Sequence, residues 1–207
     1  MGKVVSHMTM SLDGFIADPQ DGVAELFGWY EAGTVTVPSA GERCSFRVDE
    51  RSAQMLREVL AATGALVCGR RLFDHTHGWD DRHTVGAPVV VVTHHPPQDA
   101  GRWTTISFAG SAASGIAAAR QIAGDKDVAS ASASIAAQAL DLGLLDEVTI
   151  SLVPVLIGEG IPYFAGLARA PHRFDDPVII PAAASPICAM PYGGSETGPA
   201  LPQREHH

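Results

Sequence analysis

The spacing of apolar residues along the chain alternates between the period of a strand and the period of a helix. Short, apolar and often valine-rich runs predict strands at residues 4–10, 65–68, 88–92, 104–108 and 148–153. Apolar residues at helical spacing follow Asp49, recur from Ser111 to Ala123, and recur again after Ser132. Strands that alternate with helices are typical of a parallel sheet covered on both faces. We therefore expect a single α/β domain with a mixed, mostly parallel sheet flanked by helices.

The stretch from Gly124 to Phe164 is the clearest unit of this pattern. A short strand at 128–131 leads into a helix that Ser132 or Ser134 begins and Gly143 ends, and a second strand follows at 148–153. Two strands joined by one helix lie parallel, with a right-handed crossover. The tight turn before the helix presents free backbone N–H groups at the positive helix end, which favours a bound phosphate.

Two segments interrupt this regularity. Glycines and prolines break residues 28–48, where Trp29 and Tyr30 belong to an aromatic cluster. This segment is either a lid over a cleft or a long loop that its aromatic residues anchor to the core. Near the C-terminus, residues 178–180 and 187–190 predict an antiparallel strand pair, which neighbouring prolines confine to a sheet edge.

The composition narrows the range of partners and the organisation of the chain. The 207 residues suit one large domain, which we place at 1–192, with 193–207 as a disordered tail whose last three residues resemble an expression-tag remnant. The net charge of −9, without any basic cluster, disfavours nucleic acid. No apolar run reaches the roughly 18 residues of a membrane span, and no signal peptide begins the chain. Three widely separated cysteines fit a reducing cytoplasm.

Two stretches resemble the RibD C-terminal domain of the dihydrofolate reductase-like family. The family pattern is a strand, Gly-Gly-Ala-x-[IL]-x-x-Gln, a helix, Gly-[LV]-[LV]-Asp-Glu, a strand and Pro-x-[LI]-[LI]-Gly-x-Gly. The matching residues here are Gln138, Gly143, Leu144, Leu145, Asp146, Glu147, Pro154, Leu156, Ile157, Gly158 and Gly160. The second stretch, Met10–Ala17, resembles the end of the family's first strand. The resemblance covers about residues 3–192 and implies the dihydrofolate reductase-like fold.

The resemblance also implies where a substrate and the nicotinamide ring of NADPH lie. It puts Ile16 and Ala17 against that ring and Asp13 close to the active-site cleft. By itself, Asp13 followed by glycine is simply a turn dipeptide. We expect Asp13 to orient the substrate or to assist proton delivery, although a carboxyl group acts as an acid at neutral pH only with a raised pKa. The substrate is expected between Asp13, the Trp29–Tyr30 loop and Trp79.

Two further strand ends resemble cofactor-binding turns of the family. Gly69, Arg70, Arg71 and Leu72 match a Gly-Arg-x-Thr-[FY] turn that holds the pyrophosphate on backbone N–H groups, with Leu72 in place of the threonine. Arg70 or Arg71 would meet the 2′-phosphate that distinguishes NADPH from NADH, because a guanidinium group suits a phosphate. Without the resemblance, adjacent arginines are an ordinary solvated helix start. The residues expected at the adenosine end are Thr93 and His94.

The chain departs from the family where the glycine pair should stand, because Ala131 and Ser132 occupy those positions. Glycines let the backbone approach a pyrophosphate without a Cβ in the way. If the family glycines use positive φ, the replacement costs roughly 1 kcal/mol or more per residue. Serine hydroxyls could instead donate to a phosphate. The residues of this turn and helix expected at the cofactor are Ala131, Ser132, Ala133, Ser134, Ile135 and Gln138.

The family resemblance, and the chain's departure from it, lead to two functional hypotheses. The first is an NADPH-dependent oxidoreductase that reduces a C=N or C=O group of a small pterin-, pyrimidine- or related substrate, as a homodimer paired through Pro154–Phe164. The alternative is a cofactor-free member of the fold that acts as a small-molecule binding protein or a non-redox tailoring enzyme, supported mainly by Ala131 and Ser132. The chain has no Gly-x-Ser-x-Gly elbow and no P-loop. His75-x-His77 lacks metal-site spacing and further ligands, so we expect no metal.

Overall fold

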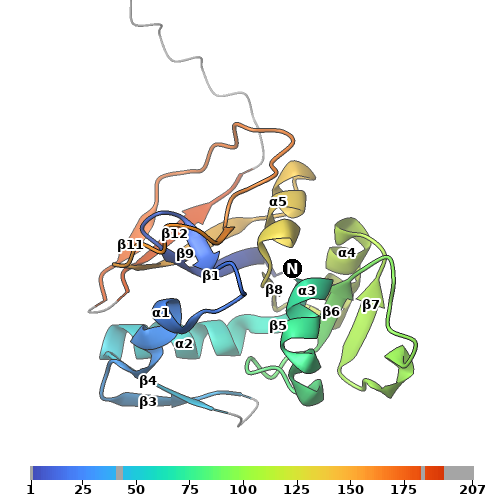
Figure 1. Ribbon diagram of the computed structural model, residues 1–207, viewed down its shortest axis with the longest axis horizontal. Helices are drawn as coiled ribbons and strands as arrows, with labels where there is room; N and C mark the ends of the chain where they lie inside the picture. The colour runs from blue at the N-terminus through green and yellow to red at the C-terminus, as the bar shows by residue number, and fades with distance from the viewer. Residues whose placement is uncertain (1, 41–43, 183–184, 194–207) are drawn as a thin grey trace, which may run out of the picture.

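The computed structural model describes residues 2–40, 44–182 and 185–193, which surround one eight-stranded sheet (Figure 1). The strand order is β11-β12-β9-β1-β8-β5-β6-β7. The six strands from β9 to β7 in this order run parallel, whereas β12 is antiparallel to β9 and β11 is antiparallel to β12. The prediction of a mixed, mostly parallel sheet flanked by helices is confirmed.

The main sheet consists of β1 (Val4–Ser11), β5 (Thr63–Gly69), β6 (Val89–Val92), β7 (Ile106–Ala109), β8 (Asp127–Ser130), β9 (Glu147–Val153), β11 (Val178–Ile180) and β12 (Ile187–Pro191). Two small pairs lie outside it: β2 (Phe15–Ala17) with β10 (Ile161–Pro162), and β3 (Val35–Pro38) with β4 (Ser45–Val48). The helices are α1 (Ala24–Phe27), α2 (Glu50–Ala62), α3 (Arg70–His75), α4 (Ala112–Ala123) and α5 (Ala133–Asp141), with short 3-10 turns η1 (Gly28–Glu31), η2 (His77–Asp81) and η3 (Ala100–Arg102).

The starts of α2 and α4 and the end of α5 lie where the sequence predicts, whereas Gly64, expected to end the helix after Asp49, lies inside β5. Asp49 accepts hydrogen bonds from the backbone N–H groups of Arg51 and Ser52 and so caps α2. A reciprocal capping box of Ser111 and Ser114 begins α4. Gly143, with φ of +66°, follows the last turn of α5 in the left-handed conformation that glycine adopts at low cost.

Helices cover the sheet on both faces. On one face, α4 and α5 pack over β5, β8, β1 and β9 in a core that includes Val67, Ile116, Ile135 and the fully buried Tyr163. On the opposite face, a second core contains residues of α2 and the β3–β4 hairpin, and a third lies under α3. Figure 1 shows α2 and the hairpin on one side of the molecule and α4 and α5 on the other.

Residues 28–40 and 44–48 are held against the core by aromatic side chains. Trp29 is only 4% exposed, and its ring stacks on Tyr30, which in turn contacts Phe46 of β4. Burial raises the pKa of Tyr30 to about 12. These contacts match the aromatic anchor rather than the lid. The hairpin β3–β4 is a correction to the sequence prediction, which has only a loop there.

The C-terminal strand pair predicted from the sequence is confirmed, because β11 and β12 form the antiparallel edge of the sheet. The predicted disordered tail lies, from residue 194 onward, outside the described residues. Within the described part of the chain, every helix is too short or too polar to span a lipid bilayer.

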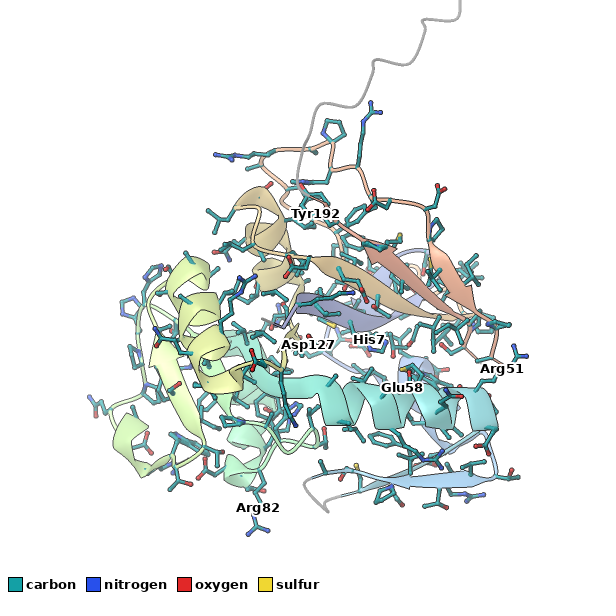
Figure 2. All side chains as sticks on the ribbon, turned by 180° about the vertical axis from the view of Figure 1, so that it is seen from behind. His7, Arg51, Glu58, Arg82, Asp127 and Tyr192 are labelled. Atoms are coloured by element: carbon teal, nitrogen blue, oxygen red, sulfur yellow. The ribbon has the colours of Figure 1, made fainter. Side chains whose placement is uncertain are left out.

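Two partly buried histidines predict a loss of stability in acid. His7 lies on β1, on the face that α2 covers, and its Nε2 is 2.9 Å from Ser151 Oγ (Figure 2). Burial lowers its pKa from 6.5 to about 4, against a smaller opposing effect of Glu147, and burial lowers the pKa of His83 to a similar value. Between pH 6.5 and 4 the unfolded chain therefore binds these protons and the folded chain does not.

We expect the free energy of unfolding to fall as the pH drops from about 6.5 to 4, by on the order of 1–3 kcal/mol for each of the two histidines. Urea unfolding at several pH values measures this slope. The substitution His7→Gln retains a hydrogen-bonding side chain opposite Ser151 and should flatten the slope, and adding His83→Gln should flatten it further. A His7→Gln slope equal to that of the unmodified protein would contradict this assignment.

Candidate functional site

The sheet has a topological switch point between β5 and β8. These strands are neighbours, but the chain leaves β5 toward β6 and leaves β8, through α5, toward β9 on the other side of β1. In open α/β sheets, ligands bind at the carboxyl ends of strands where the connections diverge in this way. Gly69 ends β5 and Ser130 ends β8, so the two turns predicted to hold a cofactor meet here.

At the switch point, a serine connects the two turns. Ser132 stands at the N-terminus of α5, yet its side chain does not cap that helix. Its Oγ instead accepts a hydrogen bond of 2.8 Å from the backbone N–H of Gly69. Ser134 Oγ lies 3.5 Å from the position that a Cβ of Gly69 would occupy, so two hydroxyls gather at this glycine. The first amides of α5 therefore keep their capacity to bind an anion, at the positive end of the helix dipole.

The replacement of the family's glycine pair needs no strained backbone. Ser132 has φ of −140° and ψ of 135°, which is extended, and Ala131 is not among the residues with positive φ. The Ala131 amide donates to the carbonyl of Val67 on β5, so the turn is tied to the neighbouring strand. The expected cost of a left-handed conformation does not arise here, because neither residue adopts one.

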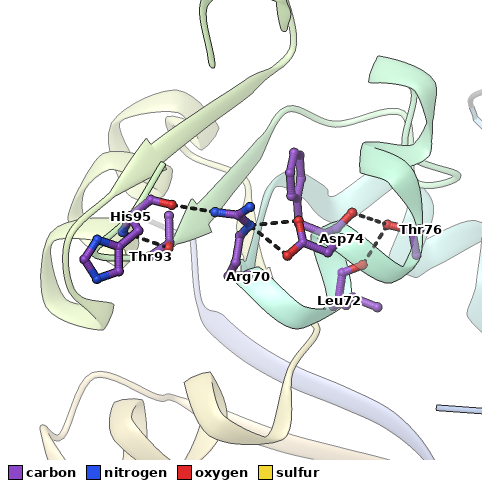
Figure 3. A network of polar contacts seen from close by, with 7 residues as sticks. Arg70, Leu72, Asp74, Thr76, Thr93 and His95 are labelled. Atoms are coloured by element: carbon purple, nitrogen blue, oxygen red, sulfur yellow. Dashed lines mark hydrogen bonds and ion pairs between the residues drawn. The ribbon is translucent and has the colours of Figure 1, made fainter. Parts of the chain in front are cut away.

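Arg70 joins α3 to the loop that follows β6. Its Nε donates to both carboxylate oxygens of Asp74, at 2.8 and 2.9 Å, and its Nη1 donates to the carbonyl of His95 (Figure 3). The amide of His95 donates to Thr93 Oγ1. The structure thus links the Gly69–Leu72 turn to the loop that contains Thr93 and His95, and Leu72 packs partly buried against the core beneath α3.

Arg71 points to a different partner. Its guanidinium group forms an ion pair of 2.9 Å with Asp21, in the turn that follows β2. On α5, the exposed Gln138 donates to the carbonyl of Ser134, and Ile135 is buried in the core. The two arginines are therefore both paired with carboxylates in this conformation.

The segment after β1 is folded back by the pairing of β2 with β10. Ala17 is opposite Ile161, and Ile16 packs against the core under α5. Asp13 accepts hydrogen bonds from Ser11 Oγ at 2.5 Å and from the backbone N–H groups of Ile157 and Gly158. These bonds, led by the one from Ser11, lower the pKa of Asp13. The carboxyl group is therefore ionised at neutral pH, opposite to what an acid catalyst requires.

The structure does not bring all three predicted substrate residues together. Trp29 is buried and its Nε1 lies 3.4 Å from Thr9 Oγ1, so it presents little surface to a ligand. Trp79 lies in a run of left-handed residues that Asp81 ties to Thr104 and Thr105, at the start of β7. Trp79 therefore lies near the amino ends of the parallel strands, because it is tied to the start of β7. Asp13 lies at their carboxyl ends, because it follows β1.

Two cavities lie away from Ser132. One cavity, of about 340 Å³, lies at the amino ends of the parallel strands and is lined by Lys3, Arg120 and Tyr192, among others. The other, of about 210 Å³, lies between α3 and η3, with Arg70 and Trp103 in its wall. At the switch point itself, the hydroxyl of Ser132 is bonded to the Gly69 amide.

Sequence reasoning missed three features of this region. Asp21 forms an ion pair with Arg71. Asp13 is surrounded by Ser11 and by the backbone amides that follow Leu156. Gly160 approaches the Ala17 carbonyl so closely that a Cβ would lie 2.1 Å from its oxygen. Ile157, Gly158 and Gly160 belong to the family motif, but the motif does not indicate these contacts. The three features depend on contacts between distant segments.

Comparison with solved structures identifies the architecture. A protein from Shewanella sp. PV-4, described as a riboflavin biosynthesis protein, matches with a TM-score of 0.67 and 19% identity, over 93% of this chain and 99% of that one. Dihydrofolate reductase from Enterococcus faecalis, solved with NADP(H), matches with a TM-score of 0.58 and 12% identity, over 92% and 96%. This chain has the dihydrofolate reductase-like fold. The resemblance predicted from the sequence is thereby confirmed at the level of the fold.

A third structure shares this fold within a longer protein. The diaminohydroxyphosphoribosylaminopyrimidine deaminase/5-amino-6-(5-phosphoribosylamino)uracil reductase of Thermotoga maritima matches with a TM-score of 0.57 and 16% identity, over 92% of this chain and 56% of that chain. No protein-family model and no curated protein sequence matches the chain. At these identities the likeness establishes the dihydrofolate reductase-like fold and leaves the reaction to be argued from the site.

Proposed function

We propose that this protein is an NADPH-dependent reductase that transfers a hydride to a C=N or C=O group of a small pterin-, pyrimidine- or related substrate. The observation that carries the proposal is the uncapped N-terminus of α5 at the β5–β8 switch point, opposite the amide of Gly69. The proteins that share the fold include reductases by name, and one was solved with NADP(H). We propose the same kind of NADPH-dependent reduction for this chain.

The residues at the switch point fit an anionic dinucleotide. Rotation of one serine side chain frees the Gly69 amide, and the free amides at the start of α5 supply further donors to a pyrophosphate. No left-handed residue has to be strained to form this seat. The proposed contacts are Gly69, Arg70, Arg71 and Leu72 on one side, Ala131, Ser132, Ala133, Ser134, Ile135 and Gln138 on the other, Thr93 and His94 at the adenosine end, and Ile16 and Ala17 at the nicotinamide end. The bound cofactor supplies the hydride.

Asp13 receives an orienting role in this proposal. Its carboxylate is ionised and accepts hydrogen bonds from the amides of Ile157 and Gly158. These bonds hold the loop after β9 beside the end of β1. A group held in this way can accept a hydrogen bond from a substrate donor, but it has no proton to give at neutral pH. The proton that completes the reduction then comes from water.

Calorimetric titration of the protein with NADPH and, separately, with NADH tests the proposal. We expect micromolar binding of NADPH, with one site per chain and a weaker affinity for NADH. Absence of binding by both nucleotides to the folded protein would remove the reductase proposal.

One observation favours a second candidate, a cofactor-free small-molecule binding protein or non-redox tailoring enzyme. The hydroxyl of Ser132 already accepts the hydrogen bond of the Gly69 amide and so connects the two turns without a ligand. The same titration separates the candidates, because a cofactor-free protein would bind neither nucleotide while remaining folded.

The segment that follows β9 supports the proposal of a homodimer. Leu156 is 70% exposed and Phe164 is 40% exposed, although both are large and apolar. Contact between two copies through Pro154–Phe164 would remove this apolar surface from water.

A further inference from the structure

The turn Asp18–Gly22, called the flap below, is a closed unit with its own internal bonds. Asp18 Oδ1 accepts hydrogen bonds from the amides of Gln20, at 2.8 Å, and Gly22, at 2.7 Å. The Asp18 amide donates to the carbonyl of Gly22 at 2.9 Å, which closes the loop. These bonds stabilise the loop conformation of the flap itself, so contacts with other segments decide how it is attached to them.

Outside its own loop, the flap forms an ion pair with α3. Asp21 Oδ2 accepts from Nε and Nη2 of Arg71, at 3.0 and 2.9 Å, and the two side chains are 25% and 67% exposed. Asp21 has φ of +66°, a left-handed conformation that aspartate and asparagine tolerate better than most residues. This geometry presents the carboxylate to α3.

The ion pair crosses the switch point. The flap follows β2, which folds back beside the end of β1, whereas Arg71 belongs to the first turn of α3 after β5. In the sheet, β8 lies between β1 and β5. A bond between the flap and α3 thus spans the carboxyl end of β8, where Ser132 meets Gly69.

We propose that Asp21 is a specificity-determining residue that competes with the 2′-phosphate of the cofactor for Arg71. In the free protein, Asp21 occupies Arg71 and latches the flap over the switch point. A 2′-phosphate takes the guanidinium group, for which it offers more charge and more acceptor oxygens than a carboxylate, and the flap is released. This inference rests on the proposed function. It implies that NADPH, which carries the 2′-phosphate, releases the flap when it binds, whereas NADH does not.

The test uses adenosine 2′,5′-bisphosphate and ADP as probes, because they differ in the 2′-phosphate and lack the reactive ring. The change Asp21→Asn keeps a residue that tolerates positive φ and removes the negative charge. We expect it to bind the bisphosphate about fivefold more tightly, the scale of an exposed ion pair, and ADP with unchanged affinity. Arg71→Gln should weaken bisphosphate binding about tenfold, and in the Arg71→Gln background Asp21→Asn should have no further effect.

Amide hydrogen exchange gives a measurement that needs no nucleotide. The amides of Gln20 and Gly22 should exchange faster in Asp21→Asn, because the unlatched flap opens more often. The matched control is Glu50→Gln, which removes the exposed ion pair with Arg57 on α2 and should change neither exchange nor affinity. If NADPH binds to the unmodified protein but Asp21→Asn alters neither quantity, the latch is wrong while the proposed function stands. If no nucleotide binds to the unmodified protein, the proposed function and the competition fail together.

Discussion

Replacing Ser132 by aspartate is expected to abolish NADPH binding without weakening the fold. Aspartate is a favourable residue at a helix N-terminus, and its carboxylate can accept the Gly69 amide bond that Ser132 Oγ accepts now. The same negative charge would face the phosphates of the cofactor at close range. We expect the affinity for NADPH to fall at least about 100-fold, because like charges that meet at a binding site cost several kcal/mol.

The informative comparison is between affinity and stability. Thermal unfolding of Ser132→Asp should occur at the same temperature as in the unmodified protein or at a higher one. Ser132→Asn is nearly the same size but carries no charge, and should weaken NADPH binding less than about tenfold. Unchanged NADPH affinity in the aspartate variant would place the cofactor away from the β5–β8 switch point.

Replacing Gly160 by alanine is expected to cause the largest loss of stability near the site. A Cβ at this position would lie 2.1 Å from the carbonyl oxygen of Ala17, well inside any van der Waals contact. The obstruction is backbone, so no side-chain rotation can relieve it. We expect a loss of about 3 kcal/mol in the free energy of unfolding, which for a chain of this size lowers the melting temperature by roughly 6–12 °C.

The control for this change is Gly101→Ala in η3, where a Cβ would have no heavy atom within 4 Å. We expect that variant to unfold at nearly the same temperature as the unmodified protein. Because Ala17 ends β2 and precedes the flap, Gly160→Ala should also weaken NADPH binding. Equal melting temperatures for the two variants would show that β2 and β10 can separate at little cost.

The parts of the fold that the sequence predicts are those set by local spacing. The strand, turn and helix around Ser132 follow from apolar periodicity and from Gly143, and the cap of α2 follows from one aspartate. The hairpin β3–β4 was missed because Pro38 and Gly41 suggest only a break, while its strands are held together by pairing with each other and by Trp29 and Tyr30.

The site was only partly predictable for a related reason. Arg71 and Asp21 are 50 residues apart, and Asp13 and Gly158 are 145 apart, so no periodicity connects them. Trp29 and Trp79 have the size and ring chemistry of substrate contacts, which is why the sequence suggests that role. In the structure Trp29 is buried in one core, and Trp79 packs partly buried against another. Ser132 was recognised as a departure from a motif, but its bond to Gly69 needed the structure.

The most direct test of the central claim is a titration of ¹⁵N-labelled protein with NADPH, followed by amide chemical shifts. We expect saturable changes that are largest at Gly69, Ala133 and Ser134, the groups that face the switch point. Two results would contradict cofactor binding at the switch point. One is changes centred on Lys3 and Tyr192, at the cavity near the amino ends of the strands, and the other is no change at millimolar NADPH.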